Sequence, residues 1–265
     1  MLPVKPFNGV FWMILALTIV AVAAIRRNFA GQPYARKTHF LTCLCACNIV
    51  VFFVYKFMLS IDAEFPMLAG IDRFNWFNEL PLQLCNINLF LIPLGVRRKS
   101  RSILGFSFFT APLGALMALL FPESSFIGYS IFTPRILGFY LTHSLLIICG
   151  LSLSALDLYR PRWRDIPGIL RTLGVLALGA HIVNTALRHT VCAYANYFFT
   201  YRTDISILNL FWKLIPVPLL YLLPGLLILL PYMCIIIAGG SLMDRRTAQP
   251  VEDEEAEEEK ITQSS

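Results

Sequence analysis

Residues 136–156 read ILGFYLTHSLLIICGLSLSAL, a run of 21 residues without Asp, Glu, Lys or Arg. An α-helix rises 1.5 Å per residue, so such a run spans about 30 Å, the thickness of the hydrocarbon core of a bilayer. Its polar side chains are a few hydroxyls, one thiol and the imidazole of His143. The stretch therefore predicts a transmembrane helix.

The same pattern recurs along the rest of the chain. Apolar runs also occupy residues 8–25, 39–59, 81–96, 103–121, 169–187 and 215–239. The third run is the shortest, with 16 residues, and its helix can begin earlier, within residues 74–80. A hydrophobic fraction of 57% and a mean hydropathy of +0.66 exclude an ordinary soluble domain. We predict an all-α fold, a polytopic membrane bundle of seven transmembrane helices.

Basic residues cluster in alternate gaps between these runs. The gaps after the first, third and fifth runs, with the segment after the seventh, hold 15 of the 22 Lys and Arg residues. Because basic loops stay on the cytoplasmic side, the pattern predicts the N-terminus outside and the C-terminus in the cytoplasm. The positive charge then faces anionic lipid headgroups and requires no nucleic-acid partner. We expect a multi-pass protein of the cell membrane with membrane lipids as partners, and its oligomeric state stays open.

The C-terminal end differs from the bundle in composition. Residues 251–260 carry seven carboxylates and little that could pack into a core. Such a block repels itself and stays solvated. The sequence therefore predicts a single transmembrane domain at 1–243, followed by a disordered acidic cytoplasmic tail at 244–265.

The first apolar run has two interpretations. Lys5 precedes it and small residues end it, which is typical of a signal peptide. Arg26 and Arg27 follow immediately and resist translocation, which favours a retained helix.

The chain contains seven cysteines, most of them within apolar runs. Cys43, Cys45 and Cys47 are two residues apart, so on a helix they point to nearly opposite sides and cannot converge on one metal. We expect no metal and no cofactor. Five of the seven cysteines are interpreted as small hydrophobic residues, and Cys192, in an outer loop, can be free or bridged.

One cysteine has polar neighbours at membrane depth. Residues 79–88 read ELPLQLCNIN and bring Gln83, Cys85 and Asn86 to the start of the third predicted helix. Polar side chains inside a bilayer are costly and usually face the bundle interior or a wet cavity. Counting along the helices places Cys85 about 6 Å and His143 about 11 Å below the outer surface.

The sixth predicted helix brings further polar groups to the same half of the membrane. His181 and Asn184 are three residues apart near its outer end and share one helical face. Asn196 and Tyr197 follow in the outer loop. We therefore expect one outward-opening cavity, lined by Gln83, Cys85, Asn86, His143, His181 and Asn184, with Asn196 and Tyr197 beside it.

A thiol within reach of an imidazole is the arrangement of an activated nucleophile. On this interpretation Cys85 is the nucleophile and His143 is the general base, while Asn86 or Asn184 orients the substrate or donates to an oxyanion. The alternative is that His143 and Asn184 only form hydrogen bonds between helices.

Several short motifs resemble those of a known family. They are LPLQLC at 80–85, TAPLGAL at 110–116, LTHS at 141–144, and Asn184 followed by Asn196 and Tyr197. In this order and spacing they are similar to the YwaF-type integral membrane proteins, whose superfamily includes the animal proteins called transmembrane protein 164. The resemblance covers roughly residues 74–235.

For the animal branch, the resemblance implies a seven-helix lipid acyltransferase with a cysteine active centre that moves a long acyl chain between phospholipids. Carried over by motif, the nucleophile falls on Cys85 and the imidazole on His143. Gln83 stands where many bacterial members are expected to have His, and Gln cannot act as a base. The first helix also lacks the histidine associated with the family.

Two functions from different classes follow. The first is a cysteine-dependent phospholipid O-acyltransferase with a Cys85–His143 site near the outer leaflet. The second is a non-catalytic carrier, channel or ligand-binding bundle with an outer-facing polar pocket. A nucleophile and its base need to approach within about 2.6–3.2 Å, whereas a binding pocket makes no such demand.

Overall fold

The protein is all-helical, as predicted. A computed structural model describes residues 2–241, and within them the only β-type pairing is an isolated bridge between Pro3 and Ser130. The helices are α1 Gly9–Asn28, α2 Tyr34–Ile61, α3 Phe65–Ala69, α4 Asn88–Arg98, α5 Arg101–Leu120, α6 Pro134–Ala155, α7 Ile166–Thr190 and α8 Ser206–Leu214, followed by a final span, Leu220–Ser241. The predicted tail at 244–265 lies outside the described residues.

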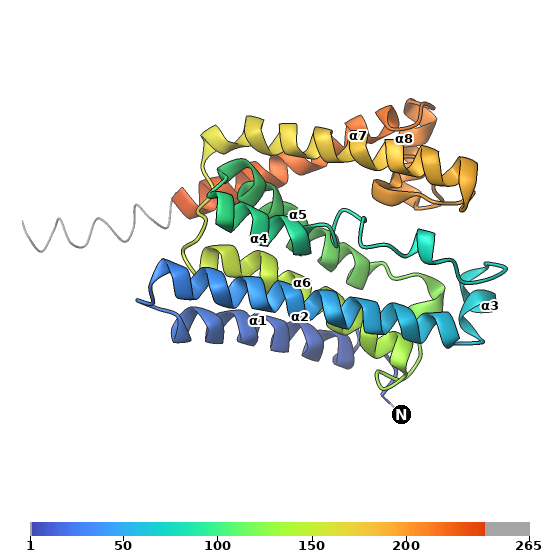
Figure 1. Cartoon of the computed structure of the whole chain (residues 1–265), viewed down its shortest axis with the longest axis horizontal. Helices are drawn as coiled ribbons and strands as arrows, with labels where there is room; N and C mark the ends of the chain where they lie inside the picture. The colour runs from blue at the N-terminus through green and yellow to red at the C-terminus, as the bar shows by residue number, and fades with distance from the viewer. Residues whose placement is uncertain (1, 242–265) are drawn as a thin grey trace, which may run out of the picture.

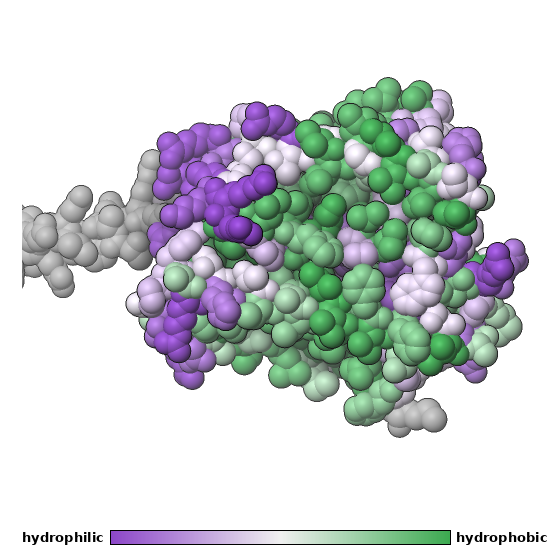
Figure 2. Space-filling model, in the orientation of Figure 1, coloured by the Kyte–Doolittle hydropathy of each residue, from purple (hydrophilic) through white to green (hydrophobic). Residues whose placement is uncertain are grey.

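Six helices in the described part of the chain are long and apolar enough to cross a membrane: α1, α2, α5, α6, α7 with the 3-10 turn before it, and the final span. They run side by side along the long axis of the molecule (Figure 1). Hydrophobic side chains form a band across the middle, with hydrophilic residues toward both ends (Figure 2). This is the surface of a protein whose middle contacts lipid, and it confirms the prediction of a multi-pass membrane bundle.

The third predicted span departs from a helix. We define the third crossing as residues 70–98, which lead from α3 at one end of the molecule to α4 at the other (Figure 1). Residues 79–87 form bends and turns, and α4 has only 11 residues. That helix is about 16 Å long, half the hydrocarbon thickness. The prediction that Gln83, Cys85 and Asn86 lie on a helix is therefore wrong.

The reason for this break is competition for backbone groups. In a helix the Leu84 carbonyl would accept from the Asn88 N–H, but here the Asn88 side-chain amide donates to Leu84 O at 2.8 Å and to Cys85 O at 3.3 Å. Asn side chains often replace backbone hydrogen bonds in this way. Asn88 also donates to Thr110 Oγ1 of α5 at 3.2 Å and is fully buried, which fixes the turn against the bundle.

The centre of the bundle is the α5–α6 pair. Within each, 61% of the most apolar window is buried, against 11% for α1 and for the α7 span. A Cβ added at Gly150 of α6 would lie 2.6 Å from Pro112 Cδ of α5, so these two backbones approach closely, as is usual in membrane bundles. The outer helices instead expose apolar side chains such as Val175 and Leu178 of α7, which face lipid in a membrane.

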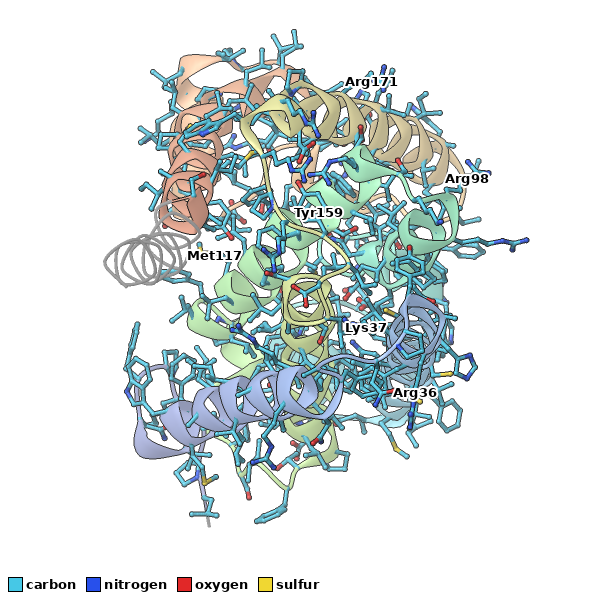
Figure 3. The ribbon with its side chains drawn as sticks, turned by 90° about the vertical axis from the view of Figure 1, so that its left-hand side faces the viewer. Arg36, Lys37, Arg98, Met117, Tyr159 and Arg171 are labelled. Carbon is cyan, nitrogen blue, oxygen red and sulfur yellow. The ribbon has the colours of Figure 1, made fainter. Side chains whose placement is uncertain are left out.

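The basic connections between helices gather at one end. The α1–α2, α4–α5 and α6–α7 connections lie together on the left of Figure 1. Figure 3, viewed from that end, shows Arg36, Lys37, Arg98 and Arg171 around the helix ends. The grouping of basic loops on one side is what the alternating pattern predicts, and the assignment of that side to the cytoplasm stays a prediction.

Candidate functional site

Five of the predicted site residues form one hydrogen-bonded network, which we call the clasp: Gln83, His181, Asn184, Asn196 and Tyr197. It holds residues 196–200 between α7 and the third crossing. Phe198 and Phe199 within it have positive φ angles of 56° and 51°, a strained conformation for bulky residues. The network of bonds supports this local strain.

Asn184 is the centre of the clasp. Its Nδ2 donates to Tyr197 O and to Thr200 Oγ1, both at 2.8 Å, and its Oδ1 accepts from the Tyr197 N–H at 2.8 Å. The side chain is fully buried. His181, one turn earlier, contacts the same Thr200 hydroxyl through Nδ1 at 3.2 Å. Both α7 residues thus form hydrogen bonds to the same loop, residues 196–200.

Two further residues tie that loop to the third crossing. Gln83 Oε1 accepts from the Phe198 N–H at 3.1 Å, and its Nε2 donates to Asn196 O at 3.4 Å. The Tyr197 hydroxyl donates to Phe77 O at 2.8 Å and accepts from the Leu80 N–H at 3.0 Å. Burial, with a smaller contribution from the nearby Glu79 charge, raises the pKa of Tyr197, so its hydroxyl stays a donor at neutral pH.

The remaining predicted residues form a second set, which we call the open group: Cys85, Asn86 and His143. Cys85 packs against α5, because a Cβ added at Gly114 would lie 3.2 Å from Cys85 Cβ. The Asn86 side chain makes no hydrogen bond within residues 2–241. The backbone N–H groups of Cys85 and Asn86 face the Cys85 sulfur, and no carbonyl of the described chain accepts from either. Both N–H groups therefore lie beside the thiol of Cys85.

His143 has one committed and one available nitrogen. Its Nδ1 lies 2.8 Å from the Phe139 carbonyl on the same helix, and its ring packs 4.5 Å from the Phe139 ring centroid. A carbonyl can only accept, so Nδ1 carries the proton in the neutral ring and Nε2 is left as a base. No hydrogen bond joins His143 to Cys85, or to any clasp residue, among the described residues.

A charged residue that the sequence interpretation missed lies near both members of this pair. Lys56 of α2 is within electrostatic reach of Cys85 and of His143. Its Nζ lies 2.5 Å from Glu79 Oε2, and the two side chains are only 14% and 16% exposed. Its position inside an apolar run was the available signal, since an ionisable residue at membrane depth is by default a functional candidate.

The other cysteines contribute no second centre. All seven are free, including Cys192, which is buried and unbridged. Cys45 of α2 and Cys149 of α6 are both fully buried and contact each other. Within residues 2–241 no group of three or more His, Cys, Asp or Glu is arranged to hold a metal ion.

Comparison with known proteins adds the family. The sequence model of the TMEM164 family matches residues 6–237. The chain belongs to this family. The match extends from before α1 into the final span, and this is a family of multi-pass membrane proteins. No curated protein and no solved structure matches the chain.

Proposed function

We propose that this TMEM164-family protein transfers acyl chains between phospholipids of the cell membrane, with Cys85 as the nucleophile and His143 as the general base. The observation that carries the proposal is the irregular backbone around Cys85. Non-helical backbone at membrane depth is tolerated where it is buried in protein or lines a polar cavity. Here it presents a partly exposed thiol beside two N–H groups from which no carbonyl of the described chain accepts.

The reaction would proceed in two balanced halves. In the first, His143 Nε2 takes the Cys85 thiol proton and the thiolate sulfur attacks the ester carbonyl carbon of a phospholipid. The carbonyl oxygen becomes an oxyanion, to which the backbone N–H groups of Cys85 and Asn86 would donate hydrogen bonds. The C–O bond then breaks, the lysophospholipid oxygen takes the proton from His143, and a thioester remains on Cys85.

The second half reverses these roles. A hydroxyl of the acceptor lysophospholipid loses its proton to His143 Nε2 and attacks the thioester carbonyl, and the Cys85 thiol is regenerated. Because no hydrogen bond joins the two side chains, proton transfer requires an imidazole rotation or a bridging water. Catalytic contacts are often long without substrate, so this geometry is compatible with the role.

Lys56 supports this chemistry as a positioning residue. Its positive charge would stabilise the negative charge that develops on the Cys85 sulfur and on the oxyanion during the attack. The Glu79 carboxylate holds the ammonium in place through their 2.5 Å contact. Neither group bonds the reacting atoms themselves.

The test is an assay with the purified full-length protein, a phospholipid acyl donor and a lysophospholipid acceptor. We expect a hydroxylamine-sensitive thioester on Cys85, seen by mass spectrometry, and loss of turnover in Cys85→Ala. Cys149→Ala and Cys43→Ala are matched controls that remove a buried and an exposed thiol elsewhere in the bundle. An adduct on another cysteine, or full turnover in Cys85→Ala, would exclude the proposed mechanism.

A second function is favoured by the half-length α4. Helices broken at membrane depth also form the substrate sites of many transporters, where helix ends and uncommitted backbone groups contact the ligand. The alternative is therefore a carrier or channel whose polar site includes Asn86 and the N-terminus of α4. Uptake of a small anion into protein-containing vesicles, unaffected by Cys85→Ala, would favour this alternative.

A further inference from the structure

The basic end of the molecule contains a cavity of about 220 Å³, and no residue of the open group lines it. It lies where the start of α2, the connection between α4 and α5, and the α6–α7 loop meet (Figure 3). Its lining residues are Tyr34, Lys99, Arg101, Leu104, Leu158 and Tyr159. Cations and hydroxyls therefore share the cavity with aliphatic side chains.

Arg101 lines this cavity, and its side chain is held in place by several hydrogen bonds. Its Nε donates to Asp165 Oδ1 at 2.9 Å, and its Nη2 donates to Asp165 Oδ2 at 2.6 Å and to Arg160 O at 2.8 Å. The Tyr159 hydroxyl donates to the same carboxylate at 3.1 Å. Asp165 thus neutralises Arg101 and fixes its orientation, while Nη1 makes no bond within the described chain and can donate to a ligand.

Lys99 supplies the net charge of the cavity. In the part of the chain that the structure describes, no carboxylate pairs with it, and its Nζ lies 5.4 Å from the centroid of the Tyr34 ring. That ring is held in place because the Tyr34 hydroxyl donates to Val96 O at 2.9 Å. With Arg101 balanced by Asp165, the cavity carries one uncompensated positive charge.

The backbone at Lys99 adds an independent observation. Lys99 ends α4 in the left-handed conformation, with φ 49° and ψ 34°, a position where glycine is favoured. A lysine in this conformation is strained, so the stability of the backbone does not explain why a lysine occupies the position. Strain of this kind concentrates at ligand contacts.

We propose that this cavity binds the phosphate group of an anionic phospholipid from the surrounding leaflet. A phosphodiester carries one negative charge, which matches the uncompensated charge, and its oxygens accept from Lys99 Nζ and Arg101 Nη1. Leu104 and Leu158 then contact the glycerol and the first methylenes of the acyl chains. A zwitterionic lipid would add an ammonium to an end of the molecule that is rich in cations, among them Arg98 and Arg171 (Figure 3).

The test is retention of phosphatidylglycerol by the purified full-length protein, titrated in detergent and measured by native mass spectrometry, with phosphatidylcholine as the comparison lipid. We expect Lys99→Gln to weaken phosphatidylglycerol binding about tenfold, the loss of one charge-assisted hydrogen bond. Arg97→Gln is the matched control, because it removes an exposed charge two residues away that does not line the cavity.

Lys99→Gly separates binding from folding. It removes the charge and relieves the left-handed backbone, so lipid binding should fall as in Lys99→Gln while the thermal midpoint rises. Binding that is unchanged in both Lys99 variants, or equal for the two lipids, would overturn the proposal. Displacement of the lipid by low-millimolar inorganic phosphate would identify free phosphate as the ligand instead.

The acidic segment at 251–260 is the other candidate occupant. A full-length variant with its seven carboxylates changed to amides should bind phosphatidylglycerol as the unmodified protein does. Binding about tenfold tighter in that variant would mean that the chain's own carboxylates fill the cavity, and the lipid assignment would fail.

Discussion

The clasp and the open group use similar residues in opposite ways. In the clasp every side chain makes at least one hydrogen bond that fixes the loop at 196–200, and Asn184 alone makes three at full burial. In the open group Asn86 makes no side-chain bond within the described residues, and the His143 ring bonds only a carbonyl of its own helix. Committed polar groups at membrane depth stabilise a structure, whereas uncommitted ones cost stability and are retained for chemistry. The two regions therefore predict different phenotypes for the same kinds of substitution.

The largest expected difference is between the two histidines. His143→Gln should lower acyl transfer about 10³-fold, because the amide cannot take the thiol proton. His181→Gln should leave turnover within about threefold, because its imidazole only contacts Thr200 in the clasp. Initial rates with phospholipid donor and lysophospholipid acceptor measure both. Equal losses in the two variants would show that the regions are one functional unit.

The two asparagines should show the reverse contrast in stability. Asn184→Leu removes three buried hydrogen bonds and leaves the Tyr197 N–H without its partner, so we expect a loss of about 3 kcal/mol. That corresponds to a fall of roughly 6–12 °C in the unfolding midpoint. Asn86→Leu is the control and should shift stability by less than about 0.5 kcal/mol. Tryptophan fluorescence melts in detergent test the pair, and a matching fall in Asn86→Leu would contradict the assignment.

The Lys56–Glu79 pair connects the two regions. Lys56→Met leaves the Glu79 carboxylate without its cation at 16% exposure, with only Asn78 Nδ2 of the described residues donating to it, and should destabilise the protein by about 2–3 kcal/mol. The double variant Lys56→Met, Glu79→Leu should regain most of this stability, yet acyl transfer should stay low because the charge near Cys85 is gone. The exposed Arg160–Asp157 pair provides a control, since Arg160→Gln should cost less than about 0.5 kcal/mol. Recovery of turnover in the double variant would exclude a role for Lys56 in the reaction.

The smallest effect concerns Glu123, in the loop after α5. Burial, followed by repulsion from Glu79, raises the pKa of Glu123. The folded state therefore binds this proton more tightly than the unfolded state, and stability is lost as the pH rises through the folded-state pKa. Glu123→Gln should raise the unfolding midpoint at pH 7.5 and make no difference at pH 4. Because the side chain still reaches solvent, the shift is small, and a larger gain at pH 4 than at pH 7.5 would contradict its sign.

Much of this architecture could be predicted because apolar length and loop charge are local properties of the sequence. The runs at 136–156 and 103–121 became α6 and α5 within a few residues. The third crossing could not be predicted in the same way, because its backbone conformation depends on partners far along the chain. Hydrogen bonds join Asn88 to Thr110, Gln83 to Phe198 and Leu80 to Tyr197. None of these contacts produces a periodic pattern in the sequence.

The site residues show the same division. Depth counting assigned Gln83, His181, Asn184, Asn196 and Tyr197 to one neighbourhood, and the structure brings these five together. Depth counting could not predict which of these polar groups form hydrogen bonds with each other, since that depends on the directions of their donors and acceptors. For the same reason the ion pair between Lys56 and Glu79 could not be predicted from the sequence.

The broken third crossing also delays part of membrane insertion until later residues have been synthesised. Residues 79–87 cannot enter hydrocarbon until their backbone groups have partners, and one of those partners, Tyr197, lies 117 residues further along the chain than Leu80. At roughly 5–20 residues per second, synthesis of that stretch takes on the order of ten seconds. During this interval the nascent chain holds an unfinished span next to completed helices. Factors that shelter polar segments during biogenesis would act on this protein at that stage.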